Sequence, residues 1–389
     1  MFDLHQSIET SEKKKTLFNL WIELMSLKKD NYKSSDKKIM NFAINLAENN
    51  KYLTGTNPSV GCVIVKNNKI LSFATTNNGG RPHAERIALN KNRYNKGTSL
   101  YSTLEPCSHY GLTPPCTNVI IKNKVKKVYY SIEDKDLRTF NKTKKILNSK
   151  KIVAISGLQK RNVKKLYNEY NYIRSNKAPY IIGKIASSSN LNILRNNSPI
   201  TNEHSRNVSH ILRFQNHAIL TSYKTINTDN PKLNCRLNGL EKFSPNVVVI
   251  DKNLKIKINS YVIKNSIKNK LIIFHCSKNI SKIRLLKNRG VKLIYQNVNN
   301  NQNFNLRKIS QKLYSLGLHR ILVETGKDLM TNFLNENLLN EFYFFKSDKI
   351  ISNTDKINIS SLVKMINKNY KNKKKINTYL DKDILTHYY

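Results

Sequence analysis

The sequence has few cysteines and no apolar run long enough to cross a membrane. Five cysteines stand among 389 residues, which is too few for a fold held together by disulfides. The chain opens MFDLHQ, without the charged start and apolar core of a secretory signal. No apolar run approaches the roughly 20 residues that a transmembrane helix needs. We therefore expect a soluble, cytoplasmic protein with reduced cysteines and no membrane partner.

Acidic residues are scarce as well. The 25 Asp and Glu residues oppose 68 Lys and Arg residues, so the formal net charge is +43. A surplus of this size is typical of proteins that bind nucleic acid. The basic residues are, however, spread through the chain together with Asn, Ile and Tyr, which share A/T-rich codons. We therefore expect no nucleic-acid partner, and a basic RNA-binding protein, whose RNA binding would fall steeply with salt, remains an alternative.

The length of 389 residues and the hydrophobic content of 39% predict two domains with ordinary cores. Residues 1–35 form an extension before the first domain, in which FNLWIELMSL (18–27) has the pattern of a short amphipathic helix. RSNKAP (174–179) interrupts the chain with a proline and polar residues. We therefore predict a first domain over 36–174 and a second over 179–389.

Both predicted domains alternate helices with strands, which indicates the α/β class. The first helix is expected to begin near Ser35, because the apolar residues after it recur at the spacing of one helix face. Strands are predicted over 61–65 and 70–74, joined as a hairpin, and over 99–104, 127–132, 151–156, 179–189, 217–222, 246–251, 270–275 and 320–325. Further helices are predicted over HSRNVSHILRF (204–214) and DLMTNFLNENLL (328–339).

Two short stretches, RPHAERIAL and EPCSHYGLTPPC, contain the ligands that zinc prefers. A catalytic zinc takes three His or Cys ligands and keeps its fourth position for water, and His83, Cys107 and Cys116 supply such a set. Glu85, two residues after the histidine, is suited to carry a proton from that water to a leaving amine. The set predicts a deaminating metal centre. A structural zinc site, which would need a fourth ligand, is the alternative.

Helices are expected to begin at or near His83 and near Cys116, with Pro115 suited to the first turn of the second helix. A helix N-terminus lowers the pKa of a thiol and stabilises negative charge on its ligand atoms. Both expected helices would therefore favour the anionic ligands of a metal.

These residues resemble the pattern H-x-E followed by P-C-x-x-C of the zinc nucleoside and base deaminases. Eight residues separate the cysteines here, in C-SHYGLTPP-C, where cytidine and tRNA deaminases have two. Together with TNPSVGCVIV (56–65), this longer motif resembles the bifunctional deaminase/reductase of riboflavin biosynthesis, the RibD family, over about residues 36–345. The long spacing speaks against an RNA-editing deaminase.

The resemblance implies two tandem three-layer α/β domains, the first cytidine-deaminase-like and the second dihydrofolate-reductase-like. It implies zinc-dependent deamination of 2,5-diamino-6-ribosylamino-4(3H)-pyrimidinone 5′-phosphate. NADPH-dependent reduction of the ribose of 5-amino-6-(5-phosphoribosylamino)uracil would follow. The implied cofactors are one Zn²⁺ in the deaminase domain and NADPH, and the implied assembly is a homodimer formed through the second domain.

In the first domain, the resemblance implies that Asn57, His109 and Asp134 contact the substrate. The chain departs from the family pattern at Thr76, where histidine is usual, and at Leu112, where a basic residue is usual. It also has Asp134-Lys135-Asp136-Leu137 in place of D-P-N-P. These departures concern affinity for the phosphate arm of the substrate, and they leave the zinc chemistry untouched.

In the second domain, HAILTSYKTINTDNPKLNCR resembles the family's T-V-x-x-D-x-P-x-L-x-x-R, and no GxGxxG loop is present. The implied substrate-binding residues are Arg206, Arg213, Leu233, Arg236 and Glu324. The implied cofactor-binding residues are Lys184, Thr201, Thr225, Asp229 and Gly326. The first two arginines are seven residues apart, so a helix presents both on one side, which suits a phosphate. Arginines that simply face solvent are the alternative.

This domain also departs from the family pattern. The family's S-L-D-G-R corresponds to Ser188-Ser189-Asn190-Leu191-Asn192, which lacks the turn-permissive glycine. Its W-I-T corresponds to Pro199-Ile200-Thr201, and its E-x-G-P to Glu324-Thr325-Gly326-Lys327. An enzyme that only deaminates, with the second domain as a scaffold, is therefore the alternative to the bifunctional enzyme.

Overall fold

The computed structural model describes residues 32–194, 199–300, 302–352 and 356–389. The predicted amphipathic segment over 18–27, and the extension as far as residue 31, lie outside these described residues. The described chain divides into two compact units, one ending at Asn176 and the other running from Lys177 to the C-terminus. No helix in the described part of the chain combines the length and the apolarity that crossing a membrane requires.

The first unit is built on a five-stranded sheet with the order β2-β1-β3-β4-β5. The predicted hairpin is confirmed, because β1 (Gly61–Lys66) pairs antiparallel with β2 (Lys69–Thr75). On its other side β1 pairs antiparallel with β3, and β3, β4 and β5 are parallel to one another. The bounds of these last strands are β3 Ser99–Leu104, β4 Lys127–Ile132 and β5 Val153–Ser156.

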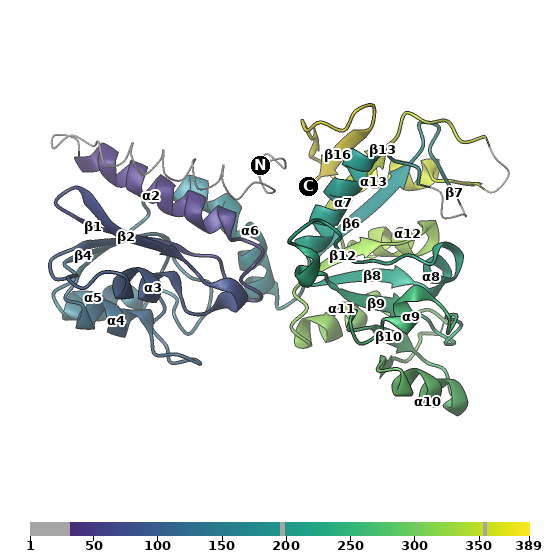
Figure 1. Ribbon diagram of the computed structural model, residues 1–389, viewed down its shortest axis with the longest axis horizontal. Coiled ribbons are helices and arrows are strands. Elements are labelled where there is room, and N and C mark those ends of the chain that lie inside the picture. The colour runs from purple at the N-terminus through teal and green to yellow at the C-terminus, as the bar shows by residue number, and fades with distance from the viewer. Residues whose placement is uncertain (1–31, 195–198, 301, 353–355) are drawn as a thin grey trace. The chain divides into compact units, whose positions relative to one another are not determined.

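Helices cover both faces of this sheet, so the unit has three layers (Figure 1). One face carries α2 (Tyr32–Asn49) and α6 (Lys160–Asn176). The other carries α3 (Ala84–Asn90), α4 (Cys116–Lys122) and α5 (Thr143–Ser149), and the short 3-10 helix Asn78–Gly80 precedes α3. The apolar face predicted for the first helix is buried. The helix packs closely on β1: a Cβ atom at Gly61 would overlap the carbonyl oxygen of Ala43.

The second unit is built on a nine-stranded sheet with the order β11-β10-β9-β8-β12-β6-β13-β16-β15. Its strands from β11 to β13 are parallel to one another. β16 pairs antiparallel with β13, and β15 pairs antiparallel with β16. Their bounds are β6 Tyr180–Ser187, β8 Ala218–Ser222, β9 Asn246–Ile250, β10 Ile272–His275, β11 Lys292–Tyr295, β12 Arg320–Glu324, β13 Glu341–Lys346, β15 Lys373–Lys375 and β16 Ile384–Tyr388. A separate two-stranded ribbon pairs β7 (Asn192–Leu194) with β14 (Lys356–Asn358).

The helices of the second unit are α7 Glu203–Phe214, α8 Tyr223–Asp229, α9 Tyr261–Lys264, α10 Ile280–Asn288, α11 Leu306–Ser315, α12 Lys327–Asn335 and α13 Ser360–Asn369, with a 3-10 helix at Glu241–Phe243. Side chains from α11, α12 and α13 form one continuous core with those of the central strands. Because parallel strands end at the same edge of a sheet, β6, β8 and β12 direct the residues that follow them to one edge.

The turn over residues 188–192, which has leucine where the family pattern has glycine, contains a residue in the left-handed conformation. Leu191 has φ 59°, a region that costs a leucine roughly 1–2 kcal/mol. Leu191 also packs against the core of the second unit, which offsets part of this cost. The chain therefore adopts this left-handed turn with leucine in place of glycine.

Candidate metal centre and second polar site

Three side chains converge where two helices begin and one strand ends. His83 immediately precedes α3, Cys116 is the first residue of α4, and Cys107 follows β3. Their ligand atoms all lie within 4.8 Å of one another. His83 Nδ1 is 3.5 Å from the Sγ atoms of both Cys107 and Cys116. A tetrahedral zinc with ordinary Zn–N and Zn–S bonds separates its nitrogen and sulfur ligands by about 3.6 Å, so the group fits zinc.

The sulfur atoms have the electrostatic setting of metal ligands. The pKa of the Cys107 thiol is lowered, chiefly because Cys116 donates a hydrogen bond to its sulfur and further because His83 does. The backbone N–H of Cys116 also donates to Cys107 Sγ at 3.2 Å. The thiolate is the form that binds a metal, and the local hydrogen bonds stabilise it. Pro115 lies one residue before the first turn of α4, at its N-cap position.

Glu85 lies beside these three residues, in the first turn of α3, and is only 3% exposed. Its Oε2 is 3.5 Å from Cys116 Sγ, and its Oε1 is 3.2 Å from the hydroxyl of Ser102 on β3. Burial raises the pKa of the Glu85 carboxyl. A carboxyl group whose pKa is raised above its ordinary value is better able to release a proton as well as take one up, as general acid–base catalysis requires.

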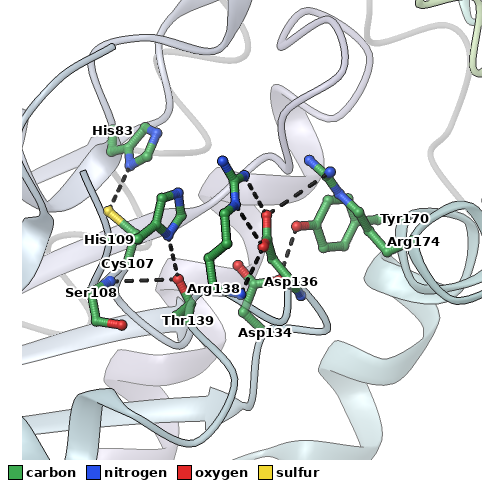
Figure 2. A network of polar contacts seen from close by, with 10 residues as sticks. All are labelled: His83, Cys107, Ser108, His109, Asp134, Asp136, Arg138, Thr139, Tyr170 and Arg174. Atoms are coloured by element: carbon green, nitrogen blue, oxygen red, sulfur yellow. Dashed lines mark hydrogen bonds and ion pairs between the residues drawn. The ribbon is translucent and has the colours of Figure 1, made fainter. Parts of the chain in front are cut away.

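His109 lies next to Cys107 in a network of polar contacts (Figure 2). Its Nδ1 is 2.9 Å from the hydroxyl of Thr139, which also accepts the backbone N–H of Ser108 at 3.5 Å. The predicted site residue Asn57 donates from Nδ2 to the carbonyl of Gly80 at 3.1 Å, just before the His83 segment. His109 therefore belongs to a segment that supplies metal-ligand candidates, and Asn57 contacts the segment that leads to His83.

Asp134 lies beside Asp136 and Arg138 in Figure 2, and its side chain already has partners. Its Oδ1 accepts the hydroxyl of Tyr170 at 2.9 Å and the backbone N–H of Asp136 at 3.0 Å. Asp136 in turn binds Arg138 through two hydrogen bonds of 2.9 and 2.6 Å. The chain's own D-K-D-L sequence thus forms a local turn closed by an ion pair.

The other departures from the family pattern differ in their surroundings. Thr76 is 1% exposed, and its hydroxyl accepts the backbone N–H of Val60 at 3.0 Å. Leu112 is 89% exposed. Near it, Arg81 donates to the hydroxyl of Thr113 at 2.9 Å. Thr76 is therefore part of the packed interior, whereas Leu112 faces solvent.

In the second unit, two predicted site residues contact a third, Glu324, which is the last residue of β12. Lys184 Nζ on β6 is 3.1 Å from Glu324 Oε1, and Arg213 on α7 contacts both carboxylate oxygens at 2.9 and 3.1 Å. Burial alone would raise the pKa of Glu324, but Arg213 and then Lys184 lower it well below its ordinary value. The carboxylate therefore stays ionised, and it holds two cations at the sheet edge.

The remaining arginines have other partners. Arg206 is exposed and donates to the carbonyl of Thr201 at 2.7 Å. Arg236 is exposed and donates to Asn234 Oδ1 at 2.9 Å, while the Asn234 carbonyl accepts Arg213 at 3.2 Å. The structure thus joins Arg213 and Arg236 through Asn234, and it leaves Arg206 near Thr201.

The other predicted residues of this unit are distributed along the same elements. Leu233 is buried and has φ 52°, and Thr225 donates its backbone N–H to the Ser222 hydroxyl at the start of α8. Asp229 ends α8, and burial raises its pKa to about 6. Gly326 is the residue immediately before α12.

Several residues at these sites have no signal of their own in the sequence. In the first unit they are Ser102, Glu105 and Thr139, and in the second His210 and Asn234. His210 Nδ1 lies 3.2 Å from the Asn234 carbonyl, and burial, followed by the charge of Arg213, lowers the pKa of His210 to about 4. Glu105 and Asn234 stand inside the recognised motifs and His210 lies one helical turn from Arg213, whereas Ser102 and Thr139 have no such position.

In comparisons with known proteins, different family models match the first unit and the second. The cytidine and deoxycytidylate deaminase zinc-binding region matches residues 33–132, and the RibD C-terminal domain matches residues 179–370. The riboflavin biosynthesis protein RibD of Aquifex aeolicus is 32% identical over 320 residues, which cover 81% of this chain and 88% of the relative. That of Chlamydia muridarum is 30% identical over 328 residues, covering 82% and 87%.

Solved structures are similar along most of the chain. Acinetobacter baumannii RibD has a TM-score of 0.77 at 25% identity, covering 91% of this chain and 98% of that one. The diaminohydroxyphosphoribosylaminopyrimidine deaminase/5-amino-6-(5-phosphoribosylamino)uracil reductase of Thermotoga maritima has a TM-score of 0.73 at 26% identity, covering 90% and 97%.

Fold, metal-ligand geometry and matches together define a fusion of a zinc-dependent deaminase domain with a reductase domain. The chain belongs to the RibD family, the bifunctional deaminase and reductase enzymes of riboflavin biosynthesis. Both domains are present, which favours the bifunctional enzyme over one that only deaminates.

Proposed function

We propose that the first unit removes the ring amine of 2,5-diamino-6-ribosylamino-4(3H)-pyrimidinone 5′-phosphate at a zinc held by His83, Cys107 and Cys116. The observation that carries this proposal is the convergence of the three ligand atoms within 4.8 Å, with the buried Glu85 beside them. When bound, zinc supplies the Lewis acidity that lets water lose a proton near neutral pH. A structural site is less well supported, because only three ligands converge in the described residues.

Glu85 would move the proton. Its carboxylate accepts one proton from the attacking water and donates it to the amine nitrogen as the carbon–nitrogen bond breaks, so that water and substrate become the uracil and ammonia. The raised pKa of Glu85 supports this use, because a carboxyl of ordinary acidity would be a poor donor at neutral pH. Asn57, His109 and Asp134 would hold the pyrimidine, and their link to the metal-ligand segments supports this assignment.

For the second unit we propose hydride transfer from NADPH to the ribose C1 of the deaminated product. The bond from C1 to the ring oxygen breaks, the oxygen takes a proton, and the open ribityl chain results. Arg206, Arg213, Leu233, Arg236 and Glu324 would bind this substrate. Lys184, Thr201, Thr225, Asp229 and Gly326 would bind the cofactor.

The buried contacts of Glu324 with Lys184 and Arg213 support this second assignment, because they fix two cations where the strands end. A phosphorylated substrate and a phosphorylated cofactor both need such positive charge. Glu324 itself would orient these cations and would not exchange protons, since its pKa is lowered.

The direct test is zinc analysis of the purified protein combined with mass spectrometry of the product. We expect about one zinc per chain, loss of the amine without NADPH, and a further gain of two hydrogens with NADPH. Deamination with no consumption of NADPH on the deaminated intermediate would instead support the enzyme that only deaminates.

We further propose a homodimer formed through the second unit and a cytoplasmic location. The RibD resemblance supports the first, and the two cysteine ligands, Cys107 and Cys116, which must stay reduced to bind metal, support the second. Sedimentation of the purified protein tests the dimer, since a monomer at micromolar concentration would contradict it.

A further inference from the structure

Glu105, which follows β3 and precedes the cysteine motif, holds a buried carboxylate that no step above uses. It is 2% exposed. Its Oε2 accepts the backbone N–H groups of Asp134 at 3.1 Å and Asn141 at 3.2 Å, and its Oε1 accepts that of Thr143 at 3.1 Å. Three backbone N–H groups thus converge on one carboxyl group.

These donors come from both ends of a single segment, the 133–143 loop, which runs from the end of β4 to the first residue of α5. One donor stands at its beginning and two stand at its end. Hydrogen bonds to an ionised acceptor are roughly twice as strong as neutral ones, and a buried carboxylate deprived of them would be costly. The hydroxyl of Thr143 adds a bond of 2.6 Å to the carbonyl of Pro106, the neighbour of Glu105. Glu105 therefore ties the 133–143 loop to the end of β3.

The 133–143 loop reaches the side chains proposed to hold the substrate. Thr139 on this loop contacts His109 Nδ1 at 2.9 Å, and Asp134 belongs to the loop itself (Figure 2). The candidate metal ligands have other supports: His83 precedes α3, Cys116 begins α4, and the Cys107 carbonyl accepts the Thr117 N–H at 3.2 Å. Loosening the loop would thus disturb His109 and Asp134 more than the metal ligands.

We propose that Glu105 is a positioning residue for substrate binding, whose carboxylate fixes the 133–143 loop and through it His109 and Asp134. This inference rests on the proposed substrate contacts of these two residues. It predicts that the charge of Glu105, and not only its size, is needed, because an amide presents an N–H group toward one of three backbone donors.

The test is Glu105→Gln in the full-length, zinc-loaded protein. We expect the KM for the deaminase substrate to rise about 10-fold, as loss of one or two charge-assisted bonds implies. We expect kcat to change less than about 3-fold and the zinc content to stay at the wild-type level. Amide hydrogen exchange at Asp134, Asn141 and Thr143 should become faster. A purely structural role would lower the folded fraction and leave the KM of the folded enzyme unchanged.

Asp251 offers a matched control in the other unit. Its carboxylate is also buried, and it accepts the backbone N–H groups of Lys255 and Ile256 at 2.8 and 2.7 Å. Asp251→Asn should loosen a comparable turn and leave the deaminase KM unchanged. A rise in that KM equal to the rise in Glu105→Gln would overturn the inference, because the effect would then not depend on the 133–143 loop.

A second variant keeps the inference testable if Glu105→Gln does not fold. Thr139→Val keeps the shape of a buried side chain and removes the hydroxyl that contacts His109; a KM rise of about 5-fold with unchanged kcat is expected, from the loss of one hydrogen bond. An unchanged KM in the folded Glu105 variant, or in the Thr139 variant if the first is unfolded, overturns the inference. Absence of deamination in the wild-type protein would instead overturn the proposed function.

Discussion

Glu85 and Glu324 are the same residue type, and both are largely shielded from solvent, yet their surroundings move their pKa values in opposite directions. Glu85 lies among sulfur atoms and a serine hydroxyl, and burial raises its pKa. Glu324 is partly buried, but Arg213 and Lys184 lie against it and lower its pKa. Burial penalises the charged form in both cases, so the presence of cations decides the outcome.

The difference separates two uses of a carboxylate. A group with a raised pKa can gain and lose a proton during a reaction, whereas a group held ionised by two cations can only attract and orient. The side chains around Glu85 are therefore suited to proton transfer. Those around Glu324 are suited to binding anionic groups.

Glu85→Gln removes the proposed proton carrier and keeps its shape. We expect deamination to fall by roughly 10²–10⁴-fold, the usual contribution of a general acid–base group. Ammonia release measures this loss, and zinc analysis checks that the metal centre is intact. NADPH oxidation on the deaminated intermediate should be unchanged, because the reductase residues lie in the other unit. Substantial ammonia release by the zinc-loaded variant would reject the role of Glu85.

Glu324→Gln leaves Lys184 and Arg213 close together without their anion. Removing one partner of a buried ion pair costs about 3–5 kcal/mol, so we expect the second unit to unfold at a markedly lower urea concentration and the reductase to be inactive. Deamination should persist. A loss of stability below about 1 kcal/mol would mean that solvent or a backbone group replaces the anion, and the contrast with Glu85 would weaken.

Asp229 extends the contrast to pH. Its folded pKa is raised to about 6 from an ordinary value of 3.8, so between these pH values the folded protein binds more protons than the unfolded chain. The free energy of unfolding should therefore decrease as pH rises from about 4 to about 6. For Glu324, whose folded pKa is lowered from 4.5, the sign is reversed, and stability should be lost as pH falls below that value.

Asp229→Asn separates these two contributions. Without NADPH, we expect the variant to gain about 1 kcal/mol at pH 7.5, a value reduced for partial exposure of the side chain. Its stability should no longer fall between pH 4 and pH 6, while the loss at lower pH should remain. Urea unfolding at several pH values measures both. An unchanged slope between pH 4 and pH 6 would assign that slope to another group.

The metal centre was the part of the molecule that sequence could specify most fully. His83, Glu85, Cys107 and Cys116 stand in two short motifs, and the helices expected near His83 and Cys116 begin at Ala84 and Cys116. Local sequence signals therefore sufficed to predict both the candidate ligand residues and the helices that carry them. The convergence of the three ligand atoms within 4.8 Å then follows from how the elements pack.

Contacts between distant residues could not be predicted in the same way. Arg213 and Glu324 are 111 residues apart, and His109 and Thr139 are 30 apart, so no periodicity or spacing relates them. The helix argument placed Arg206 and Arg213 on one side, but it could not foresee that a buried carboxylate engages only Arg213. Such pairings depend on the order of strands in the sheet, which a single sequence does not display.

An exposed ion pair provides the smallest expected effect and a control for the buried one. Lys224 Nζ lies 3.1 Å from Asp328 Oδ2, the same separation as between Lys184 and Glu324, but its side chains are 66% and 79% exposed instead of 13% and 16%. Because water screens such a pair and side-chain entropy opposes it, Asp328→Asn should change the free energy of unfolding by less than about 0.5 kcal/mol. If urea unfolding instead gave the same loss for Asp328→Asn as for Glu324→Gln, burial would not be the property that makes the Glu324 contacts important.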